Sequence, residues 1–348
     1  METRSLQPQN TLQMQSPSLM DTSFSQPVPG QSQDLEINPA STGFLMHLKD
    51  CLAENYRAVH DLAVLKGGIE NDSFRVQFTD GFEAVARIYR NKTKSQVEAE
   101  ANFLRLIQQD VRCAPFIESA AGDIIPMIDG RPFSLTKFLP GNHIAREEFT
   151  REMFFQLGKY LSITHKLTQG NCLRHFWGIT EVVQKGQSLL NMFSGCQTYR
   201  ELRDLIAGEL DILQKMRHQD LSMIHADLDV GNLLSDQDGV LWLIDWDDCG
   251  YAPAALDIAI AIRNLVVKRI ARNPELPGIK LEDACVAIAA GYGKPVENLG
   301  TWLRAACFRH AVLMLDSSFC NPQYPSRNDD NFRMLNIARQ VEQSLNQL

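Results

Sequence analysis

The hydrophobic and polar positions in the first third of the chain predict a helix followed by strands. Apolar residues recur at helical spacing from Thr42 to Asn55, which predicts one helix there. After Asn55 the helical spacing gives way to short apolar runs that are bounded by turn residues, a pattern typical of strands. The expected strands are Leu62–Leu65, Ser73–Phe78 and Phe82–Tyr89. Tight turns join them, at Gly67-Gly68 and at Thr79-Asp80-Gly81, so we expect an antiparallel sheet.

A second helix and two further strands complete the predicted N-terminal part. One apolar face marks a helix from Lys94 to Gln109 that can pack on the sheet. Strands follow over Ile124–Ile128 and Phe133–Phe138, and Leu139-Pro140-Gly141 then interrupts the pattern. We therefore predict an N-terminal lobe over residues 41–138, with a connector to a second lobe after it.

The remainder of the chain, residues 139–348, is predicted to be a mainly helical lobe. One long helix is expected between Phe149 and Leu167, and another over Tyr199–Met216. An apolar run from Gly239 to Ile244, after the turn Asp236–Gly239, predicts a hairpin within this lobe. Further helices are expected near Ala254, Leu281, Leu299 and Asn331. The fold class is therefore α+β with two lobes.

Composition limits the classes of function. Residues 1–40 are rich in Gln, Ser and Pro and have no periodicity, which predicts a disordered tail. The net charge of −8 and the lack of a dense Lys/Arg block disfavour nucleic acid as a partner. No secretory signal is visible, and the best apolar stretch, Ile258 to Val267, is too short to cross a membrane. We expect a cytoplasmic protein with no membrane partner.

One short motif carries the chemistry of the chain. His225 and Asp227 begin a His-x-Asp-x-x-x-x-Asn run that ends at Asn232, and the predicted strand after it ends in Asp245. Phosphoryl transfer of the kinase type needs a carboxylate for the attacking hydroxyl, and an amide oxygen and a second carboxylate for magnesium. Asp227 is therefore predicted to be the catalytic base, with Asn232 and Asp245 as Mg²⁺ ligands. His225 is expected to pack under the loop without titrating.

Residues of the N-terminal lobe supply candidate contacts to ATP. Arg87 on a predicted strand and Glu100 on the next helix suit a cation on the phosphates and an acid that holds this cation. Gly67 and Gly68 can form a turn whose backbone amides approach phosphate closely. Phe138 is placed at the connector, where adenine would lie, although a core position is equally compatible with the pattern.

The two motif segments, His225–Asn232 and Ile244–Asp248, resemble the aminoglycoside phosphotransferase and choline kinase superfamily of small-molecule kinases, which share the protein-kinase-like fold. The resemblance runs from about Leu62 to Arg309 and implies the same roles for Asp227, Asn232, Asp245, Arg87 and Glu100. Shorter segments, at Gly68–Asn71 and Leu303–Arg309, look like homoserine kinase of the type II sort. Ala226 departs from the superfamily, which usually has Gly there, and Arg87 replaces the Lys of protein kinases.

The acceptor is not encoded in a readable pattern. The resemblance makes homoserine or a similar amino alcohol the first hypothesis, with aminoglycoside, choline-like and hydroxylysine-like acceptors open. Substrate contacts are possible for five further residues, namely Asp229, Asp247, Asp248, Arg304 and Arg309. A protein kinase is disfavoured because no Asp-Phe-Gly or Ala-Pro-Glu run is present. A nucleotide-binding scaffold without catalysis is disfavoured because all three motif residues are intact.

Overall fold

The computed structural model describes residues 41–65, 71–139, 141–168, 178–195, 197, 200–216, 220–320 and 328–348. The predicted tail at 1–40 and the Gly67-Gly68 turn lie outside these residues. Among the helices that are described, none has the length and apolar character needed to cross a membrane. Residues Pro39–Leu348 form one unit that contains both the sheet and the helical part.

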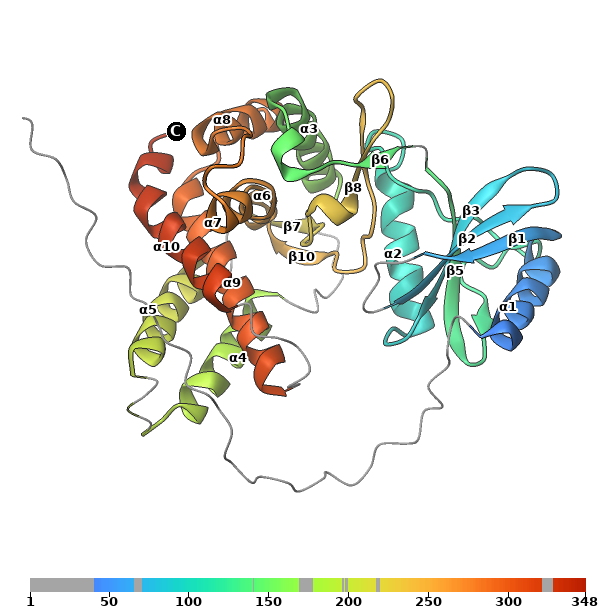
Figure 1. Cartoon of the computed structure of the whole chain (residues 1–348), viewed down its shortest axis with the longest axis horizontal. Helices are drawn as coiled ribbons and strands as arrows, with labels where there is room; N and C mark the ends of the chain where they lie inside the picture. The colour runs from blue at the N-terminus through green and yellow to red at the C-terminus, as the bar shows by residue number, and fades with distance from the viewer. Residues whose placement is uncertain are drawn as a thin grey trace, which may run out of the picture. The chain divides into compact units, whose positions relative to one another are not determined.

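A five-stranded antiparallel sheet forms the N-terminal part, with the strand order β1-β2-β3-β5-β4 (Figure 1). The strands are β1 (Val59–Val64), β2 (Asn71–Phe78), β3 (Glu83–Tyr89), β4 (Met127–Ile128) and β5 (Arg131–Lys137). The strand predicted over Ile124–Ile128 is shorter in the structure because the backbone N–H of Ile125 donates to the Asp123 carboxylate (3.0 Å), which forms a turn. The first strand begins earlier than predicted, at Val59.

Alternate residues of the central strand β3 face opposite sides of the sheet. Ala86 packs in one hydrophobic cluster with helix α1 (Thr42–Asn55). Arg87 and Tyr89 face the other side and line a cavity, and Tyr89 also packs with helix α2 (Lys94–Ile107). The two helices therefore cover opposite faces of the sheet (Figure 1). This alternation directs the Arg87 guanidinium into the cavity and not into the apolar core.

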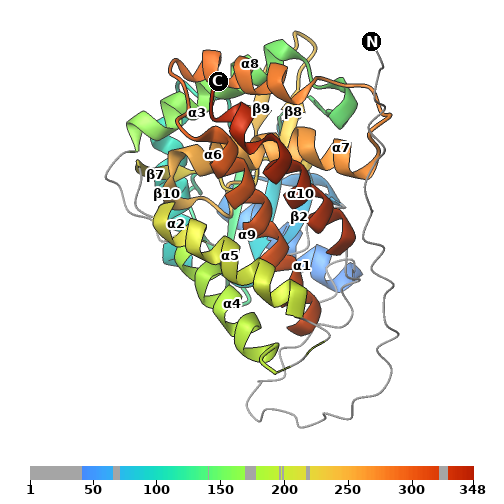
Figure 2. The ribbon, with the colours of Figure 1, turned by 90° about the vertical axis from the view of Figure 1, so that its left-hand side faces the viewer.

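The C-terminal part is mainly helical. Its helices are α3 (Arg151–Leu167), α4 (Ile179–Met192), α5 (Arg200–Met216), α6 (Ala254–Ile262), α7 (Lys268–Arg272), α8 (Leu281–Tyr292), α9 (Leu299–Cys320) and α10 (Asn328–Leu345). Figure 2 shows α9 beside α10, and α4 beside α5. Helices α3 and α8 approach closely at Gly158 and Gly291, where an added Cβ would lie 2.1 Å and 1.9 Å from backbone oxygens of the facing helix. Only glycine fits at these two positions.

Two small sheets carry the motif residues within the helical part. Strand β7 (Leu221–Ile224) pairs with β10 (Gly250–Pro253), and β6 (Asn142–His143) pairs with β8 (Leu233–Ser235), which pairs in turn with β9 (Leu241–Leu243). The predicted hairpin is thus β8–β9. With a sheet and helices first and a helical part after them, the structure confirms the predicted α+β fold.

Candidate active site

The β8–β9 hairpin brings Asn232 and Asp245 together. Asn232 comes directly before β8, and Asp245 follows β9 after one residue. Leu233 pairs with Leu243 across the hairpin, and the backbone N–H of Ile244 donates to the Asn232 carbonyl (3.0 Å). Antiparallel pairing therefore places Asn232, which precedes β8, beside Ile244 and Asp245, which follow β9.

Asp227 is held by the Asn232 side chain. The amide nitrogen Nδ2 of Asn232 donates to the Asp227 backbone oxygen (2.7 Å) and to the carboxylate oxygen Oδ2 (2.8 Å). Because Nδ2 makes both bonds, the amide oxygen Oδ1 is left for a cation. The pKa of Asp227 is raised, first because surrounding protein desolvates the carboxyl and then because Asp229 and Asp245 repel its charge, while the Arg309 guanidinium opposes this rise.

His225 and Asp257 brace the loop from beneath. The His225 ring is fully buried against Trp246, at 4.4 Å between ring centroids. Its Nε2 donates to the Ile244 carbonyl (3.1 Å), while Nδ1 accepts the Asp227 backbone N–H (3.4 Å). These two bonds require the neutral ring with its proton on Nε2. His225 thus has the positioning role expected from the sequence.

The Asp257 carboxylate accepts the backbone N–H groups of His225 and Ala226, both at 2.9 Å. His165 Nε2 donates to the same carboxylate (3.2 Å). Burial alone would raise the pKa of Asp257, but the hydrogen bond from His165 and the nearby charges lower it below its ordinary value. A charged, buried carboxylate therefore fixes the backbone on the N-terminal side of Asp227.

Two motif residues adopt left-handed backbone conformations. Ala226 has φ +68° and Asp245 has φ +62°. A residue with a Cβ is destabilised there by about 1–2 kcal/mol relative to the right-handed region. A glycine, which the resemblance stated above implies at position 226, would adopt this conformation without that strain.

We predict that Ala226→Gly leaves the free energy of unfolding within about 1 kcal/mol of the parent, because relief of strain is offset by greater freedom of the unfolded chain. Ala226→Val should lower it by about 2 kcal/mol or more, since a branched residue is both strained at positive φ and overpacked at a buried position. Urea denaturation measures both. Ala63→Val, on the exposed side of β1, is the control and should change stability by less than about 0.5 kcal/mol. Equal losses for the two valine variants would contradict the strain at Ala226.

Arg87 and Glu100 both line the cavity, but they are not ion-pair partners. Arg87 Nη1 donates to Asp245 Oδ1 (2.8 Å) and to Asp247 Oδ1 (3.1 Å). Glu100 instead accepts from Lys92 Nζ (3.2 Å). The predicted Arg87–Glu100 pairing is therefore wrong in this structure: the two carboxylates that follow β9 engage the arginine, and the lysine beyond β3 reaches the glutamate.

The pKa shifts of this cluster reflect its charges. Burial would lower the pKa of Arg87, but Asp245 and Asp247 outweigh it and raise the pKa. Desolvation, followed by repulsion from Asp247, raises the pKa of Glu100 to about 7, against the opposing effect of Lys92 and Arg87. Lys92 also donates to the Asp247 backbone oxygen (2.6 Å). Sequence reasoning missed Lys92, whose only signal was its place in a short basic stretch.

A cavity of about 540 Å³ unites most of the predicted site residues. Arg87, Glu100, Phe138, Asn232 and Asp245 all line it. Its size is within the range of small-molecule sites in proteins. Asp227, which Asn232 holds, is an exposed residue, so solvent reaches it although nearby protein partly desolvates its carboxyl. The predicted phosphate turn, Gly67-Gly68, lies outside the described residues, so its place relative to the cavity stays a prediction.

Phe138 stands at the end of the sheet, where β5 leads into the connector. Its ring lies under the Arg75 guanidinium, 4.5 Å from the ring centroid, and its backbone N–H donates to the Glu83 carbonyl (3.1 Å). Half-buried and at the cavity wall, the ring is available to a flat ligand on this side. The alternative of a fully buried core residue does not hold.

Three other charged residues considered as substrate contacts have protein partners. Asp229 pairs with Arg146 and with Lys268 (2.7 Å). Asp247 accepts from Asn71 as well as from Arg87 and Lys92. Arg304 forms a bidentate pair with Glu209, at 2.8 and 2.9 Å. The contacts of Asp229 and Asp247 stabilise the site, while Arg304 joins helices α9 and α5.

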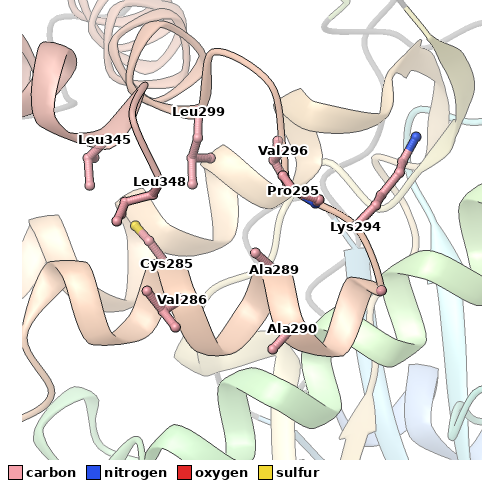
Figure 3. A pocket seen from close by; sticks show the side chains of 11 residues that line it. Cys285, Val286, Ala289, Ala290, Lys294, Pro295, Val296, Leu299, Leu345 and Leu348 are labelled. Atoms are coloured by element: carbon pink, nitrogen blue, oxygen red, sulfur yellow. The ribbon is translucent and has the colours of Figure 1, made fainter.

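A second cavity, of about 390 Å³, lies between α8 and the C-terminal residues (Figure 3). Its lining is apolar apart from Lys294, and includes Cys285, Leu299, Leu345 and Leu348. The lining holds no carboxylate or amide side chain that could bind a metal–phosphate group. The cavity lined by Asn232 and Asp245, which also holds the charged side chains of Arg87 and Glu100, is therefore the candidate active site.

The residues around this cavity fit a hard divalent cation. Within the described part of the chain, no group of three or more His, Cys, Asp or Glu side chains could hold a metal. Mg²⁺ does not require one, since it is commonly bound by one or two carboxylates with water and phosphate oxygens completing its shell. Asp245 and the Oδ1 atom of Asn232 supply oxygen ligands of this kind. These two residues therefore fit a metal ion that binds together with a phosphorylated ligand.

A protein-family model matches this sequence. The model described as "Phosphotransferase enzyme family" matches residues 61–282, more than half of the chain. The match runs from within β1 to the start of α8 and contains the residues predicted for catalysis, ATP and Mg²⁺, whereas Arg304 and Arg309 lie outside it.

Solved structures share the fold. The amicoumacin kinase hAmiN, in complex with AMP-PNP, Ca²⁺ and Ami, has a TM-score of 0.63 and 19% identity, covering 86% of this chain and 92% of that one. A microcompartment-associated aminopropanol kinase has a TM-score of 0.58 and 18% identity, with coverage of 86% and 98%. The choline kinase LicA from Streptococcus pneumoniae has a TM-score of 0.58 and 14% identity, with coverage of 85% and 98%. At these identities the likeness establishes the fold.

Proposed function

The chain belongs to the phosphotransferase enzyme family, and from that premise we propose that it transfers the γ-phosphoryl group of ATP to the hydroxyl of a small molecule with the aid of Mg²⁺. The observation that carries this proposal is the grouping of three side chains: Asn232 and Asp245 line one cavity, and Asn232 holds the Asp227 carboxylate by a hydrogen bond. A base, an amide oxygen and a second carboxylate are the groups that this chemistry needs.

Each group has a distinct role in the proposal. Asp227 accepts a hydrogen bond from the acceptor hydroxyl and takes its proton late in the transfer. Asn232 Oδ1 and the Asp245 carboxylate hold Mg²⁺, which neutralises charge on the phosphates when bound. Asn232 Nδ2 keeps Asp227 aimed, and Asp257 and His225 fix the backbone around it. The positioning of Asp227 thus depends on the same side chain that binds the metal.

Nucleotide contacts come from the cavity wall. Arg87 is proposed to hold phosphate oxygens, because a guanidinium stays charged and binds phosphate as a fork. Glu100, through Lys92, anchors the cationic cluster around Asp247. Phe138 is proposed to lie against adenine, and the Gly67-Gly68 turn to cover the phosphates. Binding of Mg²⁺ at Asp245 would free Arg87 from one of its two carboxylate partners.

For the acceptor, the proposal covers small molecules with an alcohol group, with homoserine or a similar amino alcohol first. The names of the structural relatives point to amicoumacin, aminopropanol and choline as acceptors of those proteins. Aminoglycoside, choline-like and hydroxylysine-like acceptors therefore belong in the same screen.

ADP release, measured over amino alcohols, hydroxy amino acids, sugars and aminoglycosides, tests the proposed function. We expect Mg²⁺- and ATP-dependent turnover of at least one acceptor, with appearance of its phosphate ester by mass spectrometry. A thermal scan with Mg·AMP-PNP runs in parallel, since a ligand bound only by the folded state raises the melting temperature. No turnover and no Mg-dependent shift would overturn the proposal. A shift without turnover of any acceptor would favour the nucleotide-binding scaffold.

A further inference from the structure

A buried arginine lies against the catalytic loop with part of its guanidinium unpaired. Arg263 begins η4 (Arg263–Val267), a π-helical turn that continues α6, and only 3% of its surface is exposed. Its Nε and Nη2 atoms are buried and have no hydrogen-bond partner. Buried arginines are normally fully paired because an unsatisfied charged donor is costly. π-helical turns also occur often at functional sites.

The turn contacts the residue that follows Asp227. Asn264 Nδ2 donates to the Leu228 carbonyl (2.9 Å), and Arg263 Nη1 donates to the side-chain oxygen of Asn264. Arg146 Nε donates to the Asn264 backbone oxygen (2.8 Å). The guanidinium of Arg263 is therefore joined to the loop of the proposed base through a single side chain.

The surroundings of Arg263 are rich in positive charge. Arg309 on α9 is 7% exposed, and its charge acts on Arg263 and on Asp227. Burial, with a smaller contribution from Arg309, lowers the pKa of Arg263 to about 10, so it stays charged at neutral pH. One carboxylate of the loop whose charge acts on Arg263, that of Asp229, already pairs with Arg146 and Lys268. A negative group supplied from outside would complete this cluster.

The Nε and Nη2 atoms of Arg263 lie on one edge of its guanidinium. In other arginines this edge binds a carboxylate through two parallel hydrogen bonds. Arg304 shows the same geometry elsewhere in this protein: its Nε and Nη2 donate to the two carboxylate oxygens of Glu209, at 2.8 and 2.9 Å. Such pairs add both energy and direction to recognition. In Arg263 the corresponding edge has no acidic side chain to receive it.

We propose that Arg263, with Arg309 beside it, binds a carboxylate of the acceptor, so that the substrate class is hydroxy acids and hydroxy amino acids. The inference rests on the proposed function, in which Asp227 receives the acceptor hydroxyl. It separates homoserine and hydroxylysine from choline and the aminoglycosides, whose cationic groups would meet two buried guanidinium groups. Binding brings the carboxylate to Nε and Nη2 while the hydroxyl lies at Asp227.

Matched acceptors test this inference. L-homoserine is compared with 3-aminopropan-1-ol, and L-serine with ethanolamine, since each second compound lacks only the carboxylate. For whichever pair the protein phosphorylates, we expect kcat/KM to be about 10–100-fold higher for the member with the carboxylate. This is the range given by one charged hydrogen bond. Arg263→Gln should remove that preference, because kcat/KM falls much more for the carboxylate member than for its decarboxylated partner. Arg272→Gln, an exposed arginine on α7, is the control and should keep the preference.

Three results would overturn the inference. The first is a higher kcat/KM for the decarboxylated member, and the second is an equal loss of kcat/KM for both members in Arg263→Gln. The third is that L-homoserine and L-serine add nothing to the melting temperature of a protein that Mg·AMP-PNP itself stabilises. The last result leaves the proposed function standing, whereas no shift with Mg·AMP-PNP would count against that function. If Arg263→Gln does not fold, Arg263→Lys replaces it. A lysine keeps the charge without the fork, so its expected result is a reduced preference, and an unchanged preference would contradict the bidentate site.

Discussion

Replacing Asp227 with Asn is expected to remove phosphoryl transfer and to leave nucleotide binding intact. The amide cannot accept the proton of the acceptor hydroxyl, and general-base catalysis is worth about 10²–10⁴-fold in rate. The loop should keep its conformation, because Asn232 Nδ2 can still donate to the backbone oxygen of residue 227 and to a side-chain oxygen there. We expect kcat for the best acceptor to fall by about 10²–10⁴-fold. ADP release measures kcat, and the thermal shift with Mg·AMP-PNP should be preserved.

Asp238→Asn is the matched control for this variant, since it makes the same chemical change at an exposed position on the β8–β9 turn. Its kcat should equal that of the parent within about 2-fold, as expected of a surface substitution away from the site. Asp227→Asn with a kcat within 10-fold of this control would show that another group takes the proton. Loss of the thermal shift in Asp227→Asn would instead show that Asp227 contributes to metal binding.

Much of the N-terminal part could be predicted from the sequence because its elements are long and periodic. Helix α1 has the predicted bounds, and β2 and β3 differ from prediction by one or two residues at their starts. The strands β6, β7 and β10 were not predicted. Elements of two to four residues are too short to show a period, and their pairing depends on segments distant in the chain. The assignment of lobes at residues 41–138 and 139–348 stays a prediction.

The proximity of Asp227, Asn232 and Asp245 could also be predicted, because a loop and one hairpin connect them locally. The ion pairs of the charged cluster around Arg87 and Glu100 could not be predicted. Arg87 and Glu100 are both at the cavity, yet their partners, Asp245 and Lys92, are chosen by side-chain reach across the folded site. Arg263 illustrates the same limit: in the sequence it only interrupts an apolar stretch, while the structure places it beneath the catalytic loop.

Asp245 is the charged side chain of the proposed metal site. It follows β9, pairs with Arg87, and lies on the cavity wall with Asn232. Its left-handed backbone, with φ +62°, is tolerated by Asn nearly as well as by Gly. Asp245→Asn therefore removes the negative charge without new backbone strain, whereas Asp245→Ala would combine both effects. Arg87 keeps Asp247 as a partner in this variant.

Asp245→Asn is expected to abolish the stabilisation by Mg·AMP-PNP. A ligand at 100 times its Kd stabilises the folded state by about 2.7 kcal/mol, and loss of the charged metal ligand raises Kd enough to remove most of this gain. Differential scanning calorimetry at fixed nucleotide, with and without Mg²⁺, measures the effect, and kcat/KM for ATP should fall in parallel. Asp227→Asn is the comparison, because it should lose turnover and keep the shift. A Mg²⁺-dependent shift of parental size in Asp245→Asn would show that the metal is held elsewhere, and the proposed roles of Asn232 and Asp245 would then be wrong.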